Sequence, residues 1–188
     1  MSILLNKIAE DTKNALLTVI KGAGEIGVAL QTAVKDNVVS ALKGVGQITT
    51  AATGTVSDVV SGAIVAAAQA GTTLTTAAKS IVTGAIKGAL EVGTDSMDAT
   101  QKVVSGAIKG AAEVGKDVAD VAVSSVEGVI EAAGSLGADT EKVTKTAVLA
   151  AVNAADEIGT EAGQSVRKAL LSTASLPADV VKAVIGGK

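Results

Sequence analysis

The chain has 188 residues and a net charge of −3, and it contains no aromatic residue, no histidine and no cysteine. These absences exclude disulfide bonds, thiolate or imidazole metal sites and a Ser–His–Asp triad. Without basic clusters or aromatic platforms, nothing indicates a nucleic-acid partner. Any core must be built from Ala, Val, Ile, Leu and Met, whose small side chains let helices approach closely.

Residues 1–16 are expected to form a lead-in helix. Their apolar run is short, and Lys7, Glu10 and Asp11 follow it closely. The segment is therefore not a convincing signal peptide. Because the chain has no cysteine, its residues do not indicate an oxidising or a reducing compartment. We expect a cytoplasmic or peripheral membrane location.

Residues 17–172 are predicted to be a helical repeat. TGAIKGALEVG (83–93) returns 22 residues later as SGAIKGAAEVG (105–115), and seven copies hold this register without insertion. The intervening blocks, such as TDSMDATQKVV (94–104), also match one another, so the basic unit is eleven residues. Eleven residues make three turns of helix at about 3.67 residues per turn, which is a hendecad repeat.

The repeat predicts a helix with a narrow polar stripe and a broad apolar face. Lysine recurs at the fifth position of a block, as in Lys87 and Lys109, and glutamate at the ninth, as in Glu91 and Glu113. These positions share one arc, opposite the apolar positions. The two Lys–Glu pairs are spaced i,i+4, which adds only a few tenths of a kcal/mol each.

The helices can be continuous or broken. Gly-x-Asp recurs at 93–95, 115–117 and 137–139, where glycine would end one helix and aspartate would cap the next. That alternative gives a stack of helices of roughly twenty residues each. The polar stripe stays in phase across these junctions, so we favour a continuous helix. A parallel β-helix is the weaker alternative, because the Ala-rich blocks favour helix.

Glycine in the repeat predicts close packing, since each mid-helix glycine costs ~1 kcal/mol relative to alanine. Small residues on more than one side of a helix indicate close approach of neighbouring backbones. The fold class expected is all-α and elongated, with helices packed into a bundle, tube or helical sheet by self-association. The predicted helix-packing interface comprises Gly84, Gly88, Gly93, Gly106, Gly110, Gly115, Ile86, Ile108 and Ala111.

Two segments of poor helix formers, 49–57 and 71–76, are candidate kinks or hairpin turns. Farther along, Pro177 is placed to start a short final helix over 177–185.

From Gly44 to Ala78 the only charged residue is Asp58. This uncharged middle is expected to be the most buried part of the assembly, or the part that meets lipid. Its wheel places Val65 on the polar stripe and Ile64 on the apolar face. Its Ser, Gln and Thr content disfavours a transmembrane segment, although its length is sufficient.

Two motifs that resemble binding sites have simpler explanations. GAGEIG (22–27) matches G-x-G-x-x-G, but the same positions recur throughout the repeat, and no alternation of strands and helices follows. The carboxylate pairs Asp95/Asp98 and Asp117/Asp120 fit a solvated face better than a cation site or acid–base pair. We therefore predict no catalytic, cofactor or metal site.

Small hydroxyl residues recur every eleven positions at Thr50, Ser61, Thr72, Thr83, Thr94 and Ser105. Along one helix this spacing is about 16.5 Å. In this respect residues 50–105 resemble the Ala-rich helical antifreeze proteins, and the resemblance implies ice binding. The abundant Gly and Val and the Lys/Glu stripe depart from that family.

In period alone the hendecads resemble desiccation-related late-embryogenesis proteins, synucleins, and lipid-droplet or lipoprotein coat proteins, and this implies a lipid surface as partner. The expected function is a non-enzymatic, self-assembling scaffold, a homo-oligomer without cofactors that encloses or coats hydrophobic material. The alternatives are a peripheral lipid-surface coat on a membrane or storage granule, and an ice-binding helical protein.

Overall fold

The computed structural model describes residues 10–11, 13–17, 26–44 and 50–187, and of residues 50–53 it describes the backbone alone. In this part of the chain the fold is all-α and contains no strand. The helices are α2 (Ile26–Gly44), α3 (Thr50–Gln69), α4 (Leu74–Glu91), α5 (Ser96–Glu113), α6 (Val118–Leu136), α7 (Thr140–Ile158), α8 (Thr160–Ser172) and α9 (Ala178–Gly186). Residues 10–11 and 13–17 are also helical, whereas 1–9 and 12 of the expected lead-in helix lie outside the described residues.

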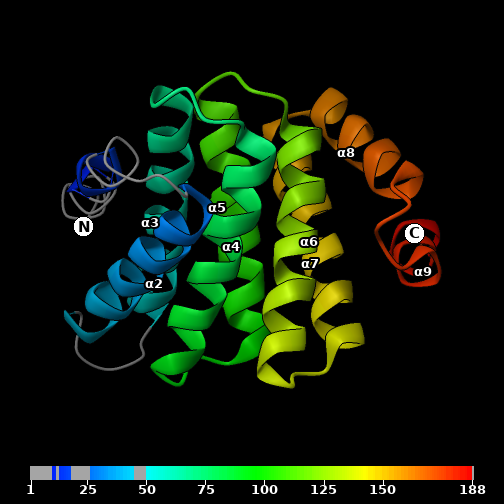
Figure 1. Cartoon of the computed structure of the whole chain (residues 1–188). Coiled ribbons are helices and arrows are strands. Elements are labelled where there is room, and N and C mark those ends of the chain that lie inside the picture. Colours follow the sequence, from blue (N-terminus) through cyan, green and yellow to red (C-terminus); the bar gives the residue numbers. More distant parts are fainter. Residues whose placement is uncertain (1–9, 12, 18–25, 45–49, 188) are drawn as a thin grey trace.

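The helices form two layers (Figure 1). From α2 to α7, each helix packs most extensively against the helix two places away, and less against its neighbours in sequence. The first layer therefore contains α2, α4, α6 and α8, and the second contains α3, α5, α7 and α9. Along α4 to α7, each 22-residue unit supplies one helix and one short turn, and successive units alternate between layers.

The turns between units are built by the Gly-x-Asp motif. Gly93 has φ +86°, and Thr94 N–H donates to the Ala89 carbonyl at 3.0 Å. This is the Schellman arrangement, which satisfies a free carbonyl at the end of α4. Asp95 then caps α5, its Oδ1 accepting from Met97 N–H at 2.9 Å and from Asp98 N–H at 3.2 Å.

The same turn follows the next two helices. Lys116 N–H donates to the Ala111 carbonyl and Ala138 N–H to the Ala133 carbonyl, both at 3.0 Å. Gly115 and Gly137 have φ of +63° and +66°, and the carboxylates of Asp117 and Asp139 cap α6 and α7. The expectation of one continuous helix is therefore wrong. A repeat of fixed length keeps its residue types in phase whether the chain runs on or turns back.

The first expected turn region is helical where it is described. Residues 50–57 belong to α3, and residue 49 lies outside the described residues. In the second region, 71–73 connect α3 to α4, and 74–76 are already helical. Gly71 precedes Gly93 by 22 residues and, like it, has a positive φ, of +75°. The helix therefore ends here as α4 ends at Gly93.

The core runs through both layers and includes most of the described side chains of α3. In this helix Ile64 is 0% exposed and Val65 is 7% exposed. The prediction that Val65 lies on a polar stripe is therefore wrong, because α3 contacts α2, α4 and α5 and has few exposed positions. Within the uncharged middle, residues 54–68 are buried or partly buried by helices of the same chain, whereas Gly71, Thr73, Thr75 and Thr76 are exposed.

Buried hydroxyls are satisfied locally. Thr100 Oγ1 donates to the Ser96 carbonyl at 2.7 Å, Ser125 Oγ to the Val121 carbonyl at 2.7 Å, and Thr144 to the preceding turn in the same way. Within the described part of the chain, no buried side-chain nitrogen or oxygen lacks a hydrogen-bond partner.

The regular units end at Gly159, which joins α7 directly to α8. A loop then leads to Pro177, and α9 begins at the next residue. Of the described helices, none combines the length and the apolarity needed to cross a membrane.

Candidate functional site

The first-layer glycines lie where α4 crosses α2. A Cβ built on Gly88 would fall 2.7 Å from the Lys35 carbonyl oxygen, and one built on Gly84 would fall under 3.0 Å from the Gln31 carbonyl oxygen. Both obstacles are backbone atoms, which cannot rotate away. Glycine is therefore what permits the separation of these two helices.

The second layer repeats this contact between α5 and α3. A Cβ on Gly110 would fall 2.8 Å from the Ser61 carbonyl oxygen, and a Cβ on Gly106 would meet the backbone of Ser57. The remaining predicted interface residues are buried nearby, with Ile86 at 3% exposure and both Ile108 and Ala111 at 0%. All these contacts join helices of one chain, whereas the sequence analysis assigned them to self-association.

A further contact of this kind was missed from sequence. A Cβ on Gly128 of α6 would fall 2.7 Å from the Lys79 carbonyl oxygen of α4. Thr83 Oγ1 bridges the same crossing, donating to the Lys79 carbonyl at 2.9 Å and to the Gly128 carbonyl at 3.2 Å. The repeat contained the signal, because Gly128 follows Gly106 by 22 residues.

Gly93 and Gly115 do not belong to this interface. A Cβ on either glycine would meet no atom within 4 Å. Both adopt the left-handed conformation at a helix end, where glycine avoids the strain that a Cβ causes. Their prediction as packing residues is therefore wrong, and their role is to end α4 and α5.

Charged side chains link helices within each layer. Lys35 pairs with Glu91 at 2.6 Å and Lys79 with Glu131 at 3.2 Å in the first layer. Lys109 pairs with Glu157 at 3.9 Å in the second. Glu91 and Lys109 thus find their partners across helices instead of at i,i+4. The hydrogen bond with Lys35 lowers the pKa of Glu91, and the same bond raises the pKa of Lys35.

Asp58 is the single charge of α3 and lies half-buried. Burial raises the pKa of its carboxyl group, and the positive charge of Lys109 opposes this shift. Its ionised form is therefore less stable in the folded chain than in water.

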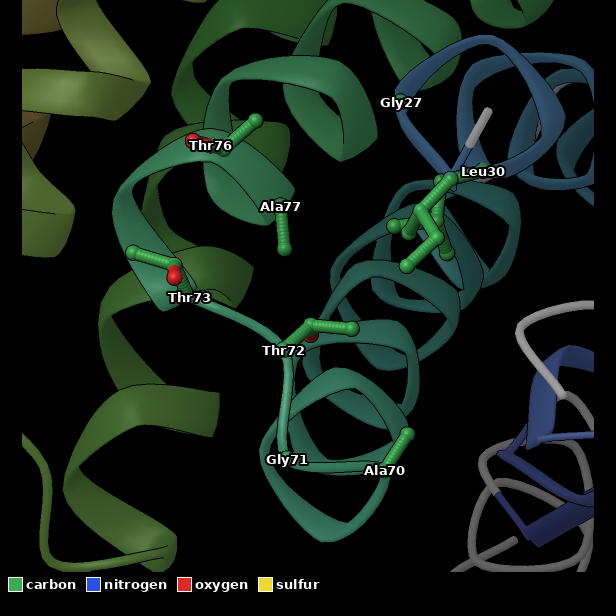
Figure 2. A pocket seen from close by; sticks show the side chains of 9 residues that line it. Gly27, Leu30, Ala70, Gly71, Thr72, Thr73, Thr76 and Ala77 are labelled. Atoms are coloured by element: carbon green, nitrogen blue, oxygen red, sulfur yellow. The ribbon is translucent and has the colours of Figure 1, made fainter. Parts of the chain in front are cut away.

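A pocket of about 440 Å³ opens where the start of α2 faces the α3–α4 turn. In Figure 2 the turn from Ala70 to Thr73 runs below the start of α4, with Leu30 of α2 on the other side. The lining has no charged residue, and Thr73, the N-cap residue of α4, makes no side-chain capping bond. A second pocket of about 450 Å³ holds the equivalent place between the start of α6 and the α7–α8 junction.

The two sequence motifs have structural roles where they are described. Asp95 and Asp117 are helix caps, which explains the carboxylate pairs. Of the segment 22–27, the first four residues lie outside the described part, and Ile26 and Gly27 begin α2. Across the described residues, no three or more Asp or Glu side chains gather as a metal site.

The eleven-residue row of hydroxyls does not form one array. Thr72 and Thr94 lie in turns, Ser61 and Ser105 lie in α3 and α5, and Thr83 is fully buried. Only the step from Thr50 to Ser61, both in α3, runs along one helix in the described residues, at a spacing of about 16.5 Å. The row does not continue along that helix, because the chain turns back after Gln69. The antifreeze resemblance does not extend to the fold.

Comparison with known proteins gives a likeness of fold. No protein-family model matches the chain, and no curated protein matches it. Among solved structures, it is similar to the crystal structure of the de novo designed helical repeat protein DHR7, with a TM-score of 0.54 and 20% sequence identity. That match covers 100% of this chain and 96% of the designed one. The chain thus has a helical repeat fold, which agrees with its two-layer stack of units.

Proposed function

We propose that this chain is a non-enzymatic helical-repeat scaffold that associates with further copies of itself. The observation that carries the proposal is the recurrence of one contact. Gly84 on Gln31, Gly106 on Ser57 and Gly128 on Lys79 follow one another by 22 residues, and a Cβ on each would fall under 3.0 Å from a backbone carbonyl oxygen of the helix that it crosses. In repeat proteins each unit contacts only its neighbours, so the contact that adds a unit also suits the addition of a second chain.

No cofactor or catalytic residue enters this proposal. The carboxylates at the turns cap helices, and Lys35, Lys79 and Lys109 pair with glutamates on neighbouring helices. The scaffold would act through its rigid shape and through the surface of its two layers.

Light scattering coupled to size-exclusion chromatography tests the proposal, over a wide range of protein concentration and without lipid. A defined oligomer whose population grows with concentration is the expected result. A monomer at every concentration would contradict self-association.

The same sample with lipid vesicles separates the scaffold from a lipid-surface coat. The apolar faces of α4 to α7 are buried between the layers, so a coat would have to open the stack. Helix content that changes only with vesicles, together with protein that floats with them, would favour the coat. Unchanged helix content and no flotation favour the scaffold.

A further inference from the structure

We draw no further inference here: the strongest candidate, the uncharged pocket of about 440 Å³ between the start of α2 and the start of α4, rests on a helix N-terminus without a side-chain cap, and nothing in the described part of the chain shows what would fill it.

Discussion

Gly110 of α5 lies directly on the backbone of Ser61 in α3. A Cβ on this glycine would fall 2.8 Å from the Ser61 carbonyl oxygen and 2.9 Å from Cβ of Ile64. Real Cβ atoms are not found at such distances, and a backbone carbonyl in a helix cannot turn aside. The separation of α3 and α5 therefore depends on the absence of one methyl group.

Replacement of Gly110 by alanine should destabilise the chain by about 1–3 kcal/mol, the usual cost of overpacking a core. Urea unfolding followed by circular dichroism measures this difference. The matched control is Gly134→Ala on the exposed side of α6, where a Cβ meets no atom within 4 Å. That variant should gain up to about 1 kcal/mol from helix propensity. Equal stabilities of the two variants would contradict the close crossing.

The sequence predicted that Gly84, Gly88, Gly106 and Gly110 permit close approach, but it did not identify the partner. A pattern of small residues indicates that another backbone lies close to the helix. In the structure this backbone belongs to a helix about fifty residues earlier in the same chain. No local spacing encodes that distance. The contacts were consequently assigned to neighbouring copies instead of neighbouring units.

Removal of an aspartate cap should cost about 1 kcal/mol. Asp117 Oδ1 accepts from Ala119 N–H at 2.9 Å and from Asp120 N–H at 3.3 Å, so Asp117→Ala leaves free donors at the start of α6. Asp120→Ala is the control, since this residue interacts only with the helix dipole and should contribute a few tenths of a kcal/mol. Thermal unfolding ranks the variants. A larger loss for the control would mean that Asp117 is not the cap.

These caps show why the preference for a continuous helix failed. The Gly-x-Asp signal at Gly93 and Asp95 indicates a helix end, whereas the in-phase polar stripe favours a continuous helix. Phase is a property of the repeat length, which is 22 residues in every unit from 83 onward. It carries no information on whether the chain reverses, whereas a left-handed glycine followed by a capping aspartate does.

Asp58 should make the chain less stable as pH rises. Burial raises the pKa of this carboxyl group in the folded state, so its ionisation costs stability between its unfolded value, about 3.9, and its higher folded value. Asp58→Asn should therefore be more stable than the wild type near pH 7, with the gain fading below pH 4 or so. Urea unfolding at several pH values measures the gain. In a Lys109→Gln background the gain should be larger, because Lys109 favours the ionised form.

Glu91 should act in the opposite direction. Its pKa is lowered by the hydrogen bond and charge of Lys35, so its contribution is present above the unfolded value, about 4.3, and is lost as pH falls through the lower folded value. Glu91→Gln should be less stable than the wild type near neutral pH and equal to it in strong acid. High salt should reduce the difference, because both side chains are partly exposed. A difference that persists in acid would exclude the ion pair as its cause.

Val65 marks the limit of a helical wheel. The wheel compared it with Lys43 and Lys87 and placed it on the polar stripe, yet it is 7% exposed. A wheel assumes that every helix has one exposed side, whereas α3 contacts helices of both layers and carries few exposed residues. Exposure in a stack depends on the number of neighbours, which a single repeat does not reveal.

The link between α7 and α8 offers a test by double-mutant cycle. A Cβ on Gly163 would collide with the carboxylate of Asp156, which is held there by Arg167. This carboxylate is the flexible end of a side chain, so Gly163→Ala should destabilise the chain less than Gly110→Ala does. In an Asp156→Ala background the collision with the carboxylate disappears, and Arg167, whose Nη1 would lie 2.9 Å from the new Cβ, is no longer held in place. The same substitution should then become neutral or gain up to about 1 kcal/mol from helix propensity. The two effects of Gly163→Ala should therefore differ in sign or size, which is the coupling that such a cycle measures.

Urea unfolding gives the four stabilities, and hydrogen exchange over residues 160–172 locates the change. Additive effects would show that Gly163 and Asp156 do not share this contact.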